Sequence, residues 1–142
     1  MALLEYAFVL IVFLTVLFGI IDFGRAMYTY HFVSNAARDG TRFAIVRGST
    51  CPPGTISYCP AGEFDYRDYL RSQMTGIGLD PNAVSADTKW PPVANNPPIC
   101  ATIFNNPGCI VQVQVSYAFK FIFPFMPANF TMQSTSQMVI SQ

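Results

Sequence analysis

The chain has 142 residues, of which 51% are hydrophobic and only 11% are charged. That length is enough for one domain, and the apolar content excludes an intrinsically disordered chain. Eight Lys and Arg residues balance eight Asp and Glu residues, so no excess of positive charge is available to neutralise phosphates. Nucleic acid is therefore not an expected partner.

The apolar residues are concentrated at the N-terminus, where Glu5 is the only charged residue between Met1 and Ile21. A helix of about 21 residues is about 30 Å long, which matches the hydrocarbon thickness of a bilayer. No basic segment precedes the run and no small-x-small cleavage site ends it, although a secretory signal peptide would have both. Residues 1–21 are therefore expected to form a membrane-spanning helix of the finished protein.

Glu5 is a carboxylate within this apolar run. On insertion scales a charge in hydrocarbon costs roughly 2.5 to 3.5 kcal/mol, so an acid in this position needs a partner. One interpretation places Glu5 at headgroup level, facing the positive end of its own helix dipole. The other pairs Glu5 with the N-terminal amine of Met1 in a neighbouring copy, which is positive at pH 7. Both interpretations are open at this point.

The first 47 residues resemble a known protein family. The start of the chain resembles the mature start of the type IV pilin superfamily: Met1-Ala-Leu-Leu-Glu5-Tyr6 followed by an apolar run. Two later motifs are similar to the TadE-like pseudopilins of tight-adherence (Flp-type) systems: Gly19-Ile-Ile-Asp22-Phe23-Gly24-Arg25-Ala26 and Asn35-Ala-Ala-Arg38-Asp39-Gly40-Thr41-Arg42. The resemblance implies that a prepilin peptidase removes a leader just before Met1, often with methylation of the new amine.

The second half of the long helix has an apolar face. Small and apolar residues recur at spacings of four and three, as in a helix packed on another surface: Ala26, Tyr30, Val33, Ala37, Gly40 and Ala44. Because no proline precedes Pro52, the sequence predicts one helix of about 47 residues, about 70 Å long. Gly19 and Gly24 each lower helix stability by about 1 kcal/mol, which suits either close packing or local unwinding during assembly.

The charged residues of this helix suggest contacts. Asp22 and Arg25 are three positions apart, so they are expected to pair where the helix leaves the bilayer and to anchor it at the interface. Arg38, Asp39 and Arg42 place two like charges at i, i+4 with an acid beside them. They favour either contacts to another segment or copy, or a solvated face. The tripeptide that begins at Asp22 also matches a kinase magnesium motif, but no Gly-rich loop or catalytic loop accompanies it.

Four cysteines follow the apolar segment, in the part of the chain that must be translocated if the first 21 residues span a membrane. An even number of cysteines in an exported head indicates disulfides, with three possible connectivities. The local pairings, Cys51–Cys59 and Cys100–Cys109, are the favoured choice. Zinc is the alternative, but spacings of eight and nine do not give the C-x2-4-C pairs of structural zinc sites.

The rest of the head has one helical pattern and several strand patterns. Residues 64–74 have aromatic and apolar side chains at helical spacing before two glycines, which predicts a short amphipathic helix. Residues 110–117 alternate apolar and polar side chains, which predicts a half-buried strand. Prolines separate this strand from residues 129–140, which predict a second, antiparallel strand. Residues 82–88 are a weaker strand candidate, and the proline-rich stretch 90–98 predicts a loop.

Together these elements predict an α+β fold like that of type IV pilins: a long N-terminal helix and a small disulfide-bonded head with a short helix and an antiparallel sheet. We divide the chain into residues 1–24, the apolar half of the helix, and 25–50, its amphipathic half packed on the head. Residues 51–142 form the globular head.

The sequence contains no pattern typical of a catalytic site. It has no Gly-rich phosphate loop, no HExxH pair and no GxSxG elbow, and the single His31 has no cysteine or paired carboxylate near it. We therefore expect no enzymatic activity, no cofactor and no bound metal. Asn129 begins an N-glycosylation sequon, which fits an exported surface without requiring the modification.

Two functions fit these features. The first is a structural subunit that forms a helical homopolymer, moving from the inner membrane into an extracellular filament with the help of prepilin peptidase and pilus assembly machinery. The second is a minor pseudopilin that stays in the inner membrane and primes or caps a filament of another pilin. A membrane-anchored enzyme or receptor would need a converging polar site, and the sequence shows none.

Overall fold

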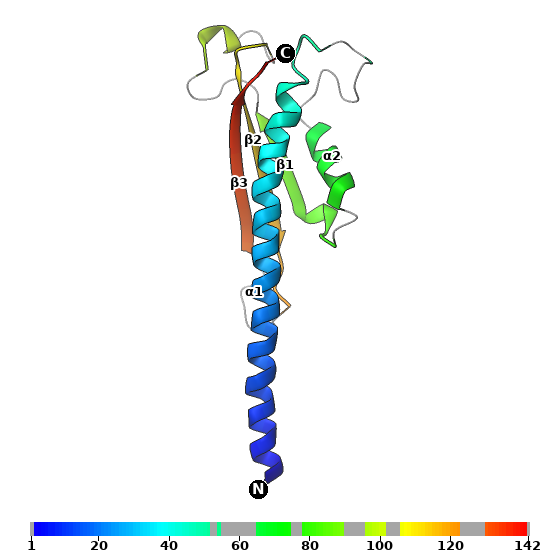
Figure 1. The fold of residues 1–142 in the computed structure, drawn as a ribbon, viewed down its shortest axis with the longest axis vertical. Helices are drawn as coiled ribbons and strands as arrows, with labels where there is room; N and C mark the ends of the chain where they lie inside the picture. Colours follow the sequence, from blue (N-terminus) through cyan, green and yellow to red (C-terminus); the bar gives the residue numbers. More distant parts are fainter. Residues whose placement is uncertain are drawn as a thin grey trace.

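A computed structural model describes residues 2–51, 54, 65–74, 78–89, 96–101, 106–122 and 130–141. Figure 1 shows one long helix that runs beside a small head and then continues far beyond it toward the N-terminus. The head contains a short helix and a three-stranded antiparallel sheet. This arrangement confirms the predicted α+β class.

The long helix, α1, spans Ala2–Ile45 and has 44 residues, so it is about 66 Å long. Its C-terminal half lies against β2 and β3, and its N-terminal half extends away from the head (Figure 1). The predicted helix of about 47 residues is therefore present, with its end two residues before the predicted one. The division of the chain at residues 24 and 50 stays a prediction.

The sheet has the order β1-β2-β3, with β1 at Val84–Lys89, β2 at Ile110–Phe119 and β3 at Phe130–Val139. Val84 pairs with Tyr117, and Phe119 pairs with Phe130, so both strand pairs are antiparallel. In β2 every second residue is buried, because one face packs on α1 while the other is half-exposed. The strand predicted at 110–117 is present as β2 and continues to Phe119. The weaker strand candidate at 82–88 is present as β1, but its first two residues belong to a short 3-10 helix, η1, at Pro81–Ala83.

The short helix, α2, spans Asp65–Met74 and buries three side chains: Tyr66, Leu70 and Met74. Its fourth predicted inward residue, Tyr69, is 37% exposed and stacks on Phe43 of α1 with a ring centroid distance of 5.3 Å. The amphipathic pattern thus places α2 against both the sheet and α1. Most of the predicted loop at 90–98 lies outside the described residues, but Asn96 uses its side-chain amide to bond both the N–H and the C=O of Ile110.

Five of the six predicted residues on this face of α1 pack on the head, with Ala26 half-buried against the core. Val33, Ala37, Gly40 and Ala44 are buried as expected. Tyr30 was wrongly assigned to this face: it is 55% exposed, and Thr29 is buried in its place. Thr29 can be buried at low cost because its hydroxyl donates to the carbonyl of Arg25 at 2.9 Å.

Gly40 marks the closest approach of α1 to the head. A Cβ atom built at Gly40 would lie 2.6 Å from Cε1 of Tyr66 and 2.7 Å from Cγ1 of Val113, so only glycine fits between α2 and β2 without rearrangement. Beside it, the Thr41 hydroxyl lies 3.2 Å from the hydroxyl of Ser136 in β3. Gly40 therefore serves close packing, while the choice between packing and local unwinding at Gly19 and Gly24 stays a prediction.

A disulfide holds the end of the head farthest from the N-terminus. Cys100 and Cys109 are bonded, with their Cα atoms 5.7 Å apart, and they pack on Ala44 and Val111. Cys100 lies in a second 3-10 helix, η2, at Pro98–Ala101. Cys51 is also disulfide-bonded; Cys59, its expected partner, lies outside the described residues.

Candidate assembly surface

The N-terminal half of α1 is an exposed apolar surface. Every residue from Leu3 to Ile21 is exposed, and α1 is long and apolar enough to cross a membrane. The large side chains with exposed fractions of 60% or more point to all sides of the helix: Leu3, Leu4, Tyr6, Phe8, Val9, Ile11, Val12, Phe13 and Ile20. A helix that is apolar all round is normally covered on every side, and this head covers only the other half. The remaining surface fits lipid or other copies of the chain.

Glu5 lies in the first turn of α1, exposed within this apolar surface. A carboxylate there is close to the positive end of the helix dipole, as the first interpretation of Glu5 requires. Met1, the other member of the predicted pair, lies outside the described residues. The pairing of Glu5 with an amine of a neighbouring copy therefore stays a prediction.

Asp22 joins α1 to the head at the point where the exposed apolar half ends. It is buried, and its Oδ1 accepts a hydrogen bond from Nη1 of Arg25 at 3.1 Å. Both carboxylate oxygens also accept from the backbone N–H of Ile122, each at 3.1 Å. The structure thus brings the expected Asp22–Arg25 pair together. It also gives Asp22 a role that sequence reasoning missed, which is to hold the chain just after β2.

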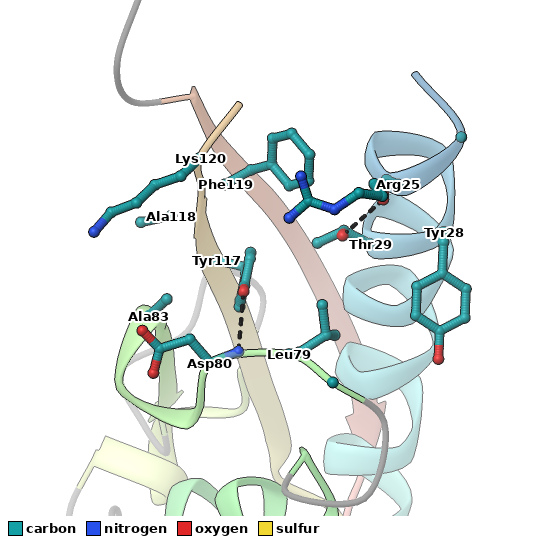
Figure 2. A pocket seen from close by; sticks show the side chains of 12 residues that line it. Arg25, Tyr28, Thr29, Leu79, Asp80, Ala83, Tyr117, Ala118, Phe119 and Lys120 are labelled. Atoms are coloured by element: carbon teal, nitrogen blue, oxygen red, sulfur yellow. Dashed lines mark hydrogen bonds between the residues drawn. The ribbon is translucent and has the colours of Figure 1, made fainter. Parts of the chain in front are cut away.

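Arg25 lies between Asp22 and the end of β2. Its guanidinium carbon is 5.4 Å from the ring centroid of Phe119, a cation–π distance. Arg25 and Phe119 line a cavity of about 490 Å3 between α1, the end of β2 and the segment before η1. Figure 2 shows Lys120 and Asp80 lining the same cavity. No sequence signal related these two residues to Arg25, because they are brought together only by the fold.

An apolar groove lies on another side of α1 at the same level. It has a volume of about 460 Å3, and its lining residues come from α1, β3 and the segment after β2: Thr15, Gly19, Asp22, Phe23, Ala26, Phe121, Phe130 and Met132. Phe130 is 54% exposed and Phe23 is 68% exposed. The exposed apolar surface of the helix therefore continues onto the end of the head.

Arg38, Asp39 and Arg42 are exposed on the other half of α1. Asp39 and Arg42 line a hollow of about 330 Å3 together with Tyr69 and Arg47. Among the residues that the structure describes, none forms an ion pair with Arg38, Asp39 or Arg42. Their contact with another copy stays a prediction, as does the alternative of a solvated face.

Tyr66 lies beneath this part of α1 and ties α2 to it. Its hydroxyl donates a hydrogen bond to the carbonyl of Ala36. Burial raises the pKa of the Tyr66 phenol well above its usual value, and the nearby charge of Asp39 raises it further. The phenol therefore stays a neutral donor under all physiological conditions.

The described part of the chain contains no group of three His, Cys, Asp or Glu side chains that could hold a metal ion. His31 is exposed and its ring lies edge-on to Tyr30, with centroids 6.1 Å apart. Asn129, the expected glycosylation position, lies outside the described residues.

The model of the TadE-like protein family matches residues 1–42. The N-terminal helix is therefore similar to this family, over less than a third of the chain. The match covers nearly all of α1 and none of the head, which agrees with the range over which the motifs were recognised. Searches among curated proteins and among solved structures found no match. The match to this family on an exposed apolar helix supports a pilin-like or pseudopilin subunit.

Proposed function

We propose that the chain is the structural subunit of a type IV pilus-like extracellular filament. The observation that carries the proposal is the exposed apolar half of α1, which is uniform around the helix and ends where the head begins at Asp22. A bilayer covers such a surface before assembly, and the same half-helices of other copies cover it in a filament core. One surface therefore serves two successive environments.

Assembly in this proposal proceeds from the inner membrane. A prepilin peptidase exposes the amine of Met1, and the assembly machinery moves the subunit from the bilayer to the growing end of the filament. There Glu5 pairs with the Met1 amine of an adjacent copy, which removes the cost of leaving both charges unpaired in an apolar core. Arg38, Asp39 and Arg42 contact the heads of neighbouring copies.

The alternative is a minor TadE-like pseudopilin that remains in the inner membrane and primes or caps a filament of another pilin. The match of the family model to the helix alone supports this function as well, because a primer needs the same helix to join the filament. The two functions differ in the number of copies per filament.

Imaging and mass spectrometry of sheared surface material separate these functions. We expect filaments whose main component by intact mass is this chain, beginning at Met1 with a free or methylated amine. Filaments made of another subunit, with this chain at trace level or only in the membrane fraction, would favour the pseudopilin. A chain that alkaline washing releases from membranes as a monomer would contradict both.

A further inference from the structure

The cavity beside Arg25 has an ordered arrangement of charge. Two cationic side chains line it, Arg25 from α1 and Lys120 from the end of β2, and Asp80 contributes one carboxylate. In Figure 2 the two cations lie on the side from which α1 runs toward the N-terminus, and Asp80 lies farther along toward the rest of the head. The backbone N–H of Asp80 bonds the hydroxyl of Tyr117 at 3.3 Å, which fixes the far side of the cavity to β2.

The position of this cavity along α1 places it at the surface of a bilayer; this step rests on the membrane insertion in the proposed function. Arg25 follows Ile21 by four residues, or about 6 Å along the helix. The headgroup layer on each side of a bilayer is about 5 to 7 Å thick, so Arg25 lies within it. Tyr28, which is 52% exposed and also lines the cavity, follows one turn later and suits the aromatic belt of a membrane protein.

Lys120 lies at the same level as Arg25 because the chain is fixed there by two contacts. The backbone N–H of Ile122 is bonded to Asp22, and the guanidinium of Arg25 lies over Phe119. These contacts hold the end of β2 beside the helix exit. Both cations therefore lie at the level of the lipid phosphates, although the Lys120 side chain extends away from Arg25 in Figure 2 and has to turn to share a phosphate with it.

Arg25 is available to a second anion. Its side chain remains 47% exposed while it pairs with Asp22, and a guanidinium has five N–H donors. Lys120 is exposed, so its ammonium can turn toward a phosphate in the same cavity. The volume of about 490 Å3 is in the range of sites that hold small molecules.

We propose that this cavity binds the headgroup of one phosphatidylethanolamine molecule, with the phosphate held by Arg25 and Lys120 and the ammonium held by Asp80. The order of charges supports this choice of lipid. In this headgroup the phosphate is attached next to the glycerol and the amine lies beyond it, and in the cavity the two cations come first and the acid lies farther from the hydrocarbon. A lipid with a phosphate but no amine would give the Asp80 carboxylate no cationic partner. The bound lipid fixes the head against the membrane until the subunit enters a filament.

The test measures lipid bound to the full-length chain. Wild type, Lys120→Gln and Asp80→Asn are purified as monomers in detergent, titrated with phosphatidylethanolamine or phosphatidylglycerol, and the bound lipids are counted by native mass spectrometry. Asparagine at position 80 keeps an oxygen for the N–H of Asn82, which Asp80 Oδ1 accepts at 2.9 Å in the wild type, so the turn is retained. We expect Lys120→Gln to weaken phosphatidylethanolamine binding roughly fivefold. Asp80→Asn should remove the preference for phosphatidylethanolamine over phosphatidylglycerol.

Matched controls exist on the same sheet. Lys89→Gln and Asp87→Asn remove the same charges from exposed positions of β1. Lys89 pairs with Gln112, five residues along β2 from Tyr117, so it lies about 17 Å from the nearest cavity residue of that strand. Both controls should bind both lipids as the wild type does.

The failure of this inference is distinguishable from the failure of the proposed function. Alkaline extraction of membranes reports insertion without reference to lipid binding. If the chain is inserted but Lys120→Gln and Asp80→Asn bind both lipids as the controls do, the cavity is not a headgroup site. If instead Lys120→Gln leaves lipid binding intact and reduces crosslinking between copies, the cavity receives a neighbouring subunit, and the lipid proposal is overturned.

Discussion

Both carboxylate oxygens of Asp22 accept a hydrogen bond from the backbone N–H of Ile122, a residue 100 positions later in the chain. Asp22 is the first charged residue after the apolar half of α1, and Ile122 follows the central strand of the head. The contact therefore fixes how far the head extends along α1 toward its apolar half. It also leaves Asp22 paired with Arg25, so the buried charge is neutralised on its own helix.

Replacing Asp22 should loosen this junction. Asp22→Ala removes a charged acceptor from the N–H of Ile122 and from Arg25, so we expect the free energy of unfolding of the head to fall by about 1.5 to 3 kcal/mol. Asp22→Asn keeps an acceptor for Ile122 without the charge and should cost less. Near-UV circular dichroism of the full chain in detergent, followed during urea titration, measures both losses. Equal stability of Asp22→Ala and wild type would contradict the junction role.

Gly40 and Gly24 make a matched pair for the packing argument. Gly40→Ala introduces a Cβ within 2.7 Å of Tyr66 and Val113, so we expect the head to lose about 1 to 3 kcal/mol of stability despite the better helix propensity of alanine. Gly24 has no neighbouring atom within 4 Å of such a Cβ, so Gly24→Ala should be neutral or stabilising by up to about 1 kcal/mol. The same urea titration compares the two. An equally stable Gly40→Ala variant would show that α2 can move aside without cost.

Tyr66 predicts how stability depends on high pH. Because burial raises the pKa of Tyr66 in the folded chain, the unfolded chain loses this proton first. The stabilisation is therefore fully present below about pH 10, the ordinary pKa of tyrosine, and is lost as the pH rises further, by up to about 1.4 kcal/mol per pH unit. Tyr66→Phe should show a shallower decline above pH 10 than wild type. Tyr30→Phe, at an exposed position of α1, should keep the wild-type slope; identical slopes for all three would exclude Tyr66 as the group responsible.

Removing the Cys100–Cys109 disulfide should show how much it contributes to the free energy of unfolding. The bond closes a short loop, so its loss in the double variant Cys100→Ala, Cys109→Ala should lower the free energy of unfolding by about 2 to 4 kcal/mol. The second core cluster around Ala44 and Val111 lies against these cysteines and should loosen with them. Hydrogen exchange of Val111 and Ile140 amides in the full chain measures that effect. Alkylation of the native protein without reduction should label no cysteine.

The elements that the sequence predicted well are those with a local period. The alternation in residues 110–117 and the uninterrupted apolar helix before residue 45 need no knowledge of distant residues. The buried face of α1 was misjudged at Tyr30 because apolarity was preferred to threonine, although the hydroxyl of Thr29 is satisfied by its own helix. A pattern of small and apolar residues cannot distinguish these neighbours, which are only 100° apart on the helix.

The contacts that join the head to the start of the apolar half of α1 could not be predicted in the same way. Asp22 and Arg25 are close in sequence and their pairing was expected, but the partner Ile122 depends on where β2 ends against α1. The cavity with Lys120 and Asp80 depends in addition on the segment that leads into β1. Such sites depend on how the sheet packs along the helix, and no local hydrophobic period in the sequence determines that packing.

Glu5 provides the sharpest test of polymerisation. If its carboxylate meets the Met1 amine of an adjacent subunit in a dry core, salt screens the attraction little, and removing the acid leaves an ammonium buried without a partner. Losing one member of a buried pair typically costs about 3 to 5 kcal/mol, and this penalty recurs at every subunit addition. We expect Glu5→Gln to insert into membranes and form its disulfides normally while entering filaments poorly. Asp87→Asn removes a carboxylate from the exposed face of the head and should assemble as the wild type does. Quantifying each variant in membrane and sheared-surface fractions gives the answer. Filaments of Glu5→Gln at wild-type yield would mean that Glu5 acts only as a charge at the N-terminus of its own helix, because an essential buried pair could not be lost without cost to assembly.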